Sequence, residues 1–283
     1  MSDFWKYVPY PRDWGYIDKE MPQDQYRAAD GVSSTEIKTL DRYSILHLKN
    51  GKGSTIAQAV ADQGNAVHHF SLREEYLVDC IPTDNRRGNV FNVPAEASRE
   101  AGHVPLPKPD YERARASADA LMKDPVVGPY LKSDDSWREV SMFAAHPRTG
   151  IPMKARPDLY VPERGLMIDI KTTTTCLPNE WQKDFHKYRY ALQAHYYMNV
   201  ARLNDLPVND FIFAVVEKDA PFATHPFRVT PEVLEWAEAI VERCLDEMLA
   251  DWNSPETCTN WPACTDIYLP NWLKPETPNM RNM

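Results

Sequence analysis

The chain has 283 residues, of which 43% are hydrophobic and 26% charged, and its formal net charge is -9. This size and composition suit one large globular domain, and no apolar run is long enough to span a bilayer. The acidic balance excludes nucleic-acid binding over the whole surface but not in a local basic channel. The chain starts without the basic and apolar regions of a secretion signal. Its five scattered cysteines lack C-x-x-C spacing, so we expect free thiols in the cytoplasm.

Aromatic residues crowd the first part of the chain. Residues 1–29 carry six tryptophans and tyrosines among prolines and charges, without a helical or strand period. We predict an irregular N-terminal arm that covers the core, with packing on a neighbouring subunit as the alternative. A core over 30–252 and a Pro-rich tail over 253–283 follow. We therefore expect a single domain, 1–283, with two appendages.

Two helices are expected next. The run Ser33-Ser34-Thr35-Glu36 is a capping signature and predicts a helix to about residue 48. A second helix, starting near residue 54, contains Gly64-Asn65-Ala66-Val67-His68-His69. Gly64 and His68 are four apart and share a face, where the glycine would let another backbone approach closely. A lone helical histidine is more often structural or solvated than a ligand.

The middle of the chain is less regular. Residues 85–109 show no clear period and are predicted to form a long connection. A helix over 111–124 follows and stops before Pro125. Residues 137–145 alternate well enough for one strand, which carries Glu139. We interpret Glu139 as an accessory acid, or as an edge-strand glutamate in water.

Residues 154–171 hold the most informative pattern. They predict two short strands joined by a turn at 162–165. Side chains alternate along a strand, so Lys154, Arg156 and Asp158 point the same way on the first strand. On the second strand Asp169 and Lys171 share a face. The side chains at 168 and 170 turn to the opposite, apolar side.

If these strands pair, two carboxylates and a lysine meet. Carboxylates at close range repel unless a cation lies between them. Magnesium suits such a place, because it takes one or two protein carboxylates together with phosphate oxygens and water. A nearby lysine can orient the attacking water or neutralise charge on a phosphate. The alternative is an exposed hairpin with a surface ion pair.

The last third predicts a long helix over 179–203, a central apolar strand over 211–217 and a final helix capped by Thr230-Pro231. Gln193 and Tyr197 are four apart on the long helix and share a face. Its basic residues are candidates for phosphate contacts: Lys183, Lys187 and Arg189. Its aromatic stripe is more typical of core packing.

These patterns resemble a known superfamily. R-P-D at 156–158 followed by I-D-I-K-T at 168–172 is similar to the PD-(D/E)XK nuclease motif, with Asp in place of the commoner Glu as second acid. G-x-A-x-H at 64–68 and Q-x-x-x-Y at 193–197 resemble its RecB-type branch. V-V-E-K-D-A-P-F at 215–222 resembles the exonuclease VIII (RecE-like) exonucleases of phages and prophages.

The resemblance implies an α/β fold, with a central mixed sheet flanked by helices, and an active site. His68, Asp158, Asp169 and the carbonyl of Ile170 would hold one or two Mg²⁺ ions, or Mn²⁺ in their place. Lys171 would orient the attacking water. The implied supporting residues are Gln193, Tyr197 and Glu139, and the expected DNA contacts are Lys154, Arg156, Lys183, Lys187 and Arg189.

The implied activity is digestion of linear double-stranded DNA from its ends, in the 5'-to-3' direction, leaving 3' single strands. The resemblance also implies a ring-shaped homo-oligomer, a trimer or tetramer, and a single-strand annealing protein as partner. We expect no membrane partner. The implied setting is phage-type recombination or repair in the cytoplasm of a bacterial host.

Two other interpretations remain open. The first is another nuclease of the superfamily, an endonuclease or a CRISPR-adaptation nuclease. The absence of closely spaced cysteines counts against the iron–sulfur type. The second is a non-catalytic scaffold that binds DNA ends, against which the intact Asp158, Asp169 and Lys171 argue.

Overall fold

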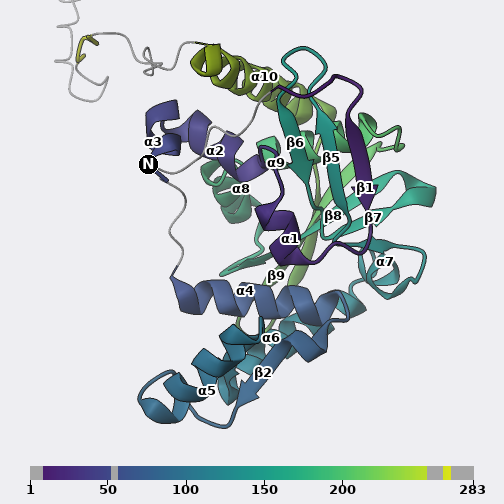
Figure 1. Ribbon diagram of the computed structural model, residues 1–283. Coiled ribbons are helices and arrows are strands. Elements are labelled where there is room, and N and C mark those ends of the chain that lie inside the picture. The colour runs from purple at the N-terminus through teal and green to yellow at the C-terminus, as the bar shows by residue number, and fades with distance from the viewer. Residues whose placement is uncertain (1–8, 52–56, 254–263, 269–283) are drawn as a thin grey trace, which may run out of the picture.

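The structure is a computed structural model that describes residues 9–51, 57–253 and 264–268 (Figure 1). The expected start of the second helix near residue 54 and most of the expected tail lie outside these residues. Within them no helix is long and apolar enough to cross a membrane. The four cysteines that fall within them are all free thiols.

A five-stranded mixed sheet lies at the centre, in the order β10-β9-β8-β7-β4. Only β8 and β9 are parallel neighbours; the other pairs are antiparallel. The expected mixed sheet flanked by helices is thus confirmed, as is the central position of the apolar strand β9. The strands are β4 (Trp137–Arg138), β7 (Leu159–Val161), β8 (Leu166–Thr173), β9 (Asp210–Glu217) and β10 (Thr224–Arg228).

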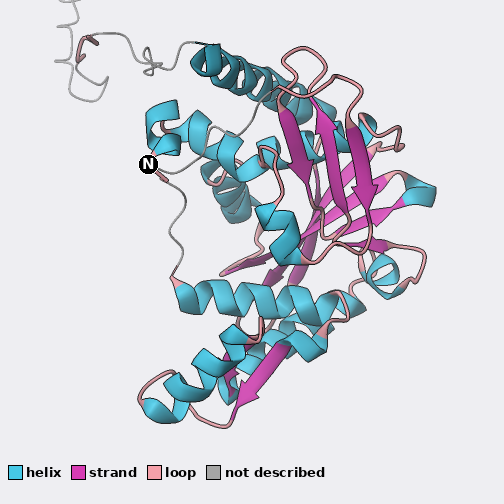
Figure 2. Ribbon diagram, viewed as in Figure 1, coloured by secondary structure: helices cyan, strands magenta, loops and turns pink. Residues whose placement is uncertain are grey.

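Helices cover the central sheet (Figure 2), and each face of the sheet buries its own hydrophobic cluster. Ile168 and Ile170 face α4 (Gln58–Ser71) and α6 (Lys108–Lys123), as their alternation with Asp169 predicted. Met167 and Phe213 belong to the other cluster. That face is covered by α2 (Ser34–Arg42), α8 (Pro178–Lys187), α9 (Tyr190–Arg202) and α10 (Pro231–Asn253).

A second, three-stranded sheet has the order β1-β5-β6. Its strands are β1 (Gly15–Asp18), β5 (Ser141–Ala145) and β6 (Pro152–Ala155). The stretch 154–161, predicted as one strand, is therefore two strands in different sheets. Residues 156–158 connect them, and Pro157 cannot donate to a strand ladder. The strand predicted over 137–145 also divides, at Glu139, whose φ of 43° ends β4 before β5 begins.

The N-terminal arm is more ordered than expected. It forms β1, which pairs with β5, and helix α1 (Gln23–Ala28). Tyr16 stacks on Phe143 with ring centroids 4.5 Å apart. Its described aromatic residues thus pack on their own chain, as the interpretation of a local cover predicted. Sequence periodicity missed β1 because four residues are too few to show an alternation.

Two predicted helices are interrupted. The helix expected to reach residue 48 ends at Arg42, and Ser44 begins α3 (Ile45–Lys49) by accepting a hydrogen bond from the His47 amide. The helix expected over 179–203 breaks at Arg189, whose φ is 56°. Both breaks fall at non-glycine residues inside continuous apolar patterns, which therefore gave no sign of them.

The region predicted as a long connection is folded. It contains α5 (Asn89–Glu100) and β3 (Val104–Pro107), which pairs in parallel with β2 (Val78–Ile81). Helix α5 buries Phe91 and Ala95 although Pro94 lies inside it. The proline concealed the helical period. The remaining elements are η1 (Glu75–Leu77), α7 (Gly128–Lys132) and η2 (Pro162–Arg164).

Candidate active site

The predicted hairpin of β7 and β8 brings the two acids to one place. Leu159 of β7 pairs with Ile168 of β8 in the antiparallel ladder. Asp158, just before β7, therefore lies beside Asp169, the next residue along β8. The Oδ2 atom of Asp158 accepts a 2.6 Å hydrogen bond from the Ile170 amide. The same oxygen lies 3.3 Å from Nδ1 of His68, on α4. The first acid is therefore held by one backbone group and one imidazole.

The second acid is held from two sides. Lys171, two residues further along β8, forms an ion pair with Oδ2 of Asp169. Gln193 on α9 donates a 2.6 Å hydrogen bond from Nε2 to Oδ1 of the same carboxylate. Asp158 and Asp169 are both buried. The predicted Asp, Asp, Lys, His and Gln side chains thus converge on one cluster.

The two acids differ in their ionisation. Burial raises the pKa of a carboxyl group, yet the pKa of Asp158 is lowered because His68 and Lys171 outweigh burial. The pKa of Asp169 is raised by burial, and Lys171 does not offset this because the charge of Asp158 also raises it. The cluster therefore favours one ionised carboxylate at Asp158 and a carboxyl at Asp169 that gains protons more easily.

The two basic groups of the cluster both have raised pKa values. Burial alone would lower the pKa of Lys171, but the nearby carboxylates, Asp169 first, outweigh it and raise that pKa. Burial likewise opposes the charge of His68, and Asp158 outweighs burial and raises the pKa of the imidazole. Lys171 is therefore a positive charge at neutral pH.

Sequence reasoning missed Lys38, on α2. Its Nζ lies 3.3 Å from Oε1 of Gln193, the amide that binds Asp169. Burial and the charge of Lys171 lower the pKa of Lys38 to about 8. No motif pointed to Lys38, because its position depends on how α2 packs against α9. The contact orients the Gln193 amide, since a lysine accepts no hydrogen bond and must face the carbonyl oxygen.

The two adjacent histidines have different partners. His68 faces Asp158, whereas Nδ1 of His69 lies 2.9 Å from Oε2 of Glu74. This geometry agrees with the choice of His68 as the candidate ligand. The expectation that Gly64 admits a neighbouring backbone was wrong. Among the described residues, the one atom within 4 Å of a Cβ built there is Oγ1 of Thr172, at 3.6 Å, which is ordinary contact.

Tyr197 and Glu139 are the two other residues expected to support the site. Tyr197 is partly buried, and desolvation raises its pKa well above the ordinary value, so it stays a neutral phenol. Glu139 forms an ion pair with Arg156, at 2.9 Å. The Glu139 amide also donates to the carbonyl of Asp158. Glu139 thus supports the backbone of the first acid, while its carboxylate is engaged by an arginine.

The five predicted DNA contacts fall into two groups. Lys154 is buried and donates from Nζ to the carbonyls of Tyr26, Arg27 and Ala29, and Arg156 donates to Met21, Ser141 and Glu139. This geometry gives both a structural role in holding α1 and offers no support for phosphate contact. The others are on or after α8: Lys183 pairs with Glu180, Arg189 with Asp41, and Lys187 lies over the ring of Tyr188.

An open cleft of about 410 Å³ leads to the cluster. One wall is α4, from Val60 to His68, and the floor is β8 from Ile170 onward. The opposite wall comes from α8, α9 and the residues between them. It presents the rings Trp181, Tyr188 and Tyr190. The cleft thus gives a substrate access to Lys171 and His68.

The donor set fits a hard divalent cation. Among the described residues no three His, Cys, Asp or Glu side chains form a ready-made metal cage. Magnesium does not need one, because it usually keeps several waters and takes one or two carboxylates together with substrate phosphate oxygens. Asp158 and Asp169 supply those carboxylates, and the repulsion between them is the kind that a cation relieves.

Comparisons with known proteins agree with this geometry. The model of a family described as "PDDEXK-like domain of unknown function (DUF3799)" matches residues 33–266. A protein from Eubacterium rectale described as "Putative exonuclease" aligns over 89% of this chain and 96% of its own, at 16% identity. Its TM-score of 0.59 shows a similar fold.

A phage-related exonuclease from Haemophilus somnus 129PT aligns over 81% of this chain and 98% of its own, at 13% identity. Its TM-score of 0.36 is too low to establish a shared fold. No curated protein matches the sequence.

Proposed function

We propose, from the premise that the chain belongs to the family of PDDEXK-like domains DUF3799, that it is a Mg²⁺-dependent exonuclease acting on the ends of linear double-stranded DNA. Domains of the PDDEXK type generally use divalent metal ions. The observation that carries the proposal is the convergence of Asp158, Asp169 and Lys171 beside an open cleft. Burying charged groups costs folding free energy. Buried charges that line a cleft are therefore typical of catalytic sites.

His68, Asp158, Asp169 and the carbonyl of Ile170 would hold the metal. When bound, it would lower the pKa of a water and stabilise charge on the phosphate. The chain's own contribution is to fix the two carboxylates. The Ile170 amide and His68 hold Asp158, while Gln193 and Lys171 hold Asp169.

Lys171 acts as a cation in this scheme. Its raised pKa keeps it protonated at neutral pH, so it orients the attacking water and neutralises developing negative charge. Gln193 positions Asp169, and Lys38 positions Gln193. These contacts tie the carboxylate to two helices that pack on the sheet, which limits its movement during hydrolysis.

The finer features of the proposal rest on the resemblance to the RecE-like exonucleases. They are 5'-to-3' digestion that leaves 3' single strands, a ring-shaped trimer or tetramer, and a single-strand annealing protein as partner. We place this activity in phage-type recombination or repair in the bacterial cytoplasm.

The test compares linear duplex DNA, labelled at one 5' end, with a closed circle of the same sequence. We expect the protein with Mg²⁺, or Mn²⁺, to release labelled mononucleotides from the linear DNA and to leave the circle intact. Lys171→Ala should release none. Lys132→Ala, which removes an exposed lysine on α7, should match the wild type. Nicking of the circle would indicate an endonuclease, and no cleavage with either metal would favour a non-catalytic scaffold.

A further inference from the structure

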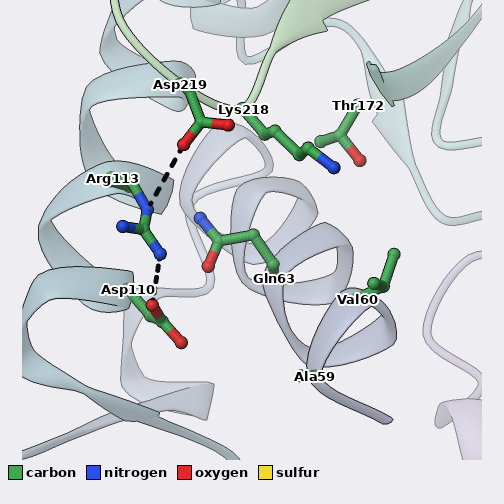
Figure 3. Close-up of a pocket in the computed structure, with 8 residues that line it drawn as sticks. All are labelled: Ala59, Val60, Gln63, Asp110, Arg113, Thr172, Lys218 and Asp219. Carbon is green, nitrogen blue, oxygen red and sulfur yellow. Dashed lines mark hydrogen bonds and ion pairs between the residues drawn. The ribbon is translucent and has the colours of Figure 1, made fainter. Parts of the chain in front are cut away.

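The cleft does not end at the acids. A second hollow of about 230 Å³ adjoins it and shares three lining residues with it: Val60, Thr172 and Lys218. The two spaces therefore lie side by side along α4, and together they are called the groove below. Figure 3 shows the far end of this groove, where Gln63, Arg113 and Asp219 gather.

Lys218 lies at the junction of the two spaces. It follows β9 directly, and its backbone amide donates to the carbonyl of Thr173 at the end of β8. Because β8 and β9 are parallel, their carboxyl ends meet at the same edge of the sheet. Lys171, Thr172 and Lys218 therefore line the same groove, with the second lysine further from the acids than the first.

The charges along the groove are unequal. Arg113 is neutralised, since it forms ion pairs with Asp110 and Asp219. Lys218 forms no ion pair with any described residue, and in Figure 3 its side chain extends toward Thr172. A half-buried ammonium group in a groove, without an acidic partner, is suited to binding an anionic ligand from solution.

The opposite wall supplies flat apolar surface. Tyr188 is 41% exposed and lines the cleft, and its ring centroid lies 5.7 Å from that of Tyr190. Grooves that combine cations with exposed aromatic rings are typical of sites for single-stranded nucleic acid. The cleft volume of about 410 Å³ lies in the range of pockets for drug-sized ligands, which is the size of a nucleotide.

We propose that this groove binds one unpaired DNA strand, and that Lys218 contacts a phosphate of that strand next to the one being cleaved. The proposal rests on the proposed nuclease function and adds the path of the substrate strand to it. Lys218 is a binding residue here, separate from the cluster that carries out hydrolysis.

Binding can be measured without hydrolysis. A fluorescent oligothymidylate is titrated with protein in EDTA at several salt concentrations, and fluorescence anisotropy gives the dissociation constant. Each lost phosphate contact should reduce the slope of log K against log salt by about 0.7 for a single strand. Lys218→Ala should therefore bind more weakly, with a slope shallower by about that amount, and Lys218→Arg should keep the wild-type slope.

The matched control is Lys132→Ala, whose lysine lies on α7, near the edge strand β4 and three strands away from β9. It should bind as the wild type does. A wild-type slope in Lys218→Ala, or no binding of the oligonucleotide by the wild type, would overturn the proposal. Equal binding of a blunt duplex, with the same dependence on Lys218, would overturn its single-strand part.

The two proposals can fail separately. Binding in EDTA is measured even if the wild type never cleaves DNA, so loss of the nuclease function leaves the test of Lys218 readable. If cleavage is intact, Lys218→Ala should raise KM more than it lowers kcat, because the lysine binds the strand away from the reacting phosphate. A fall in kcat alone would contradict this assignment. Thermal melting of each variant checks that folding is unchanged.

Discussion

Asp158 and Asp169 are chemically identical residues that the protein treats differently. Asp158 accepts a hydrogen bond from the Ile170 amide and faces His68, and its pKa is lowered. Asp169 is buried beside another acid, and its pKa is raised although Lys171 contacts it. The contacts of each side chain, and not its type, set its charge. Burial has the largest effect on the pKa of Asp169, and Lys171 is the group that most favours its charged form.

A double-mutant cycle at this pair should separate stability from activity. Lys171→Met leaves a buried carboxylate unpaired, which should lower the free energy of unfolding by about 3–5 kcal/mol. It should also lower kcat by about 100- to 1,000-fold, because a transition-state contact is lost. Adding Asp169→Asn should restore most of the stability and none of the activity. Urea unfolding and single-turnover cleavage measure the two quantities.

Two results of this double-mutant cycle would contradict the prediction. If Lys171→Met loses activity only in proportion to its loss of folded protein, Lys171 serves stability alone. Recovery of cleavage in the double variant would likewise remove Asp169 from the chemistry.

Lys38 should show the opposite balance. Its pKa of about 8 lies below the ordinary value of 10.5, so burial of its charge costs stability at neutral pH. Lys38→Met should therefore raise the free energy of unfolding at pH 7, and it should lower cleavage because the Gln193 amide loses its orienting contact. Urea unfolding and cleavage at pH 7 test both expectations.

The pH dependence of stability gives Lys38 a signature. Between pH 8 and 10.5 the folded protein binds fewer protons than the unfolded chain at this residue. Stability contributed by this group should therefore rise with pH across that window. Lys38→Met should lack the rise. The same pH profile in the variant and in the wild type would show that this lysine does not titrate there.

The candidate residues could be predicted only where a motif marked them. His68, Asp158, Asp169, Lys171 and Gln193 were found from their spacing and the resemblance, and the structure brings them together, although their roles stay predictions. Lys38 and Lys218 have no such spacing. Their positions follow from the packing of α2 on α9 and from the parallel pairing of β8 with β9, which one sequence does not display.

At the scale of elements, helix stability and an open cleft favour different residues at one position of α4. Its Gly64 lowers helix stability, yet the glycine faces Thr172 across the cleft. Gly64→Ala should raise the free energy of unfolding by about 0.5–1 kcal/mol, since the added methyl group meets only ordinary contact. Gly64→Leu fills the cleft and should reduce DNA binding. Thermal melting and oligonucleotide binding distinguish the two effects.

The two variants of Gly64 control for helix propensity, because alanine and leucine are both strong helix formers. A destabilised Gly64→Ala would mean that Thr172 cannot adjust to the methyl group. Unchanged binding by Gly64→Leu would show that the strand does not pass this position.

Elements with strong, uninterrupted patterns could be predicted. Helices α6 and α10, strand β9 and the β7–β8 hairpin all follow from periodicity and turn residues. The breaks could not, because each falls within an apparently continuous pattern. Glu139 and Arg189 adopt positive φ without being glycine, and tertiary contacts hold them there.

At the scale of the whole molecule, metal binding and folding should be linked. A cation that binds only the folded chain stabilises it, by about 2.7 kcal/mol at roughly 100 times its Kd. We expect Mg²⁺ to raise the Tm of the wild type, whereas Asp158→Asn should respond weakly. NaCl at matched ionic strength is the control. An equal rise in both proteins would mean that the ion binds elsewhere.

The fold class could be predicted because the order of motifs along the chain matches a known arrangement of strands and helices. The division into two sheets could not, since the residues on either side of Pro157 read as one strand. Register and sheet membership depend on partners distant in sequence, such as β1 for β5 and β9 for β8.

Asp158 lies in the short connection that leaves one sheet and enters the other. Lys154 and Arg156 lie just before Pro157. Lys154 donates hydrogen bonds to carbonyls in and just after α1, and Arg156 donates one to the carbonyl of Met21. The N-terminal segment and the first acid are therefore mechanically linked, although the segment does not line the cleft. In a screen that reads only activity, substitutions in α1 would look like damage to the catalytic machinery, because a displaced α1 shifts the carboxylate without unfolding the protein.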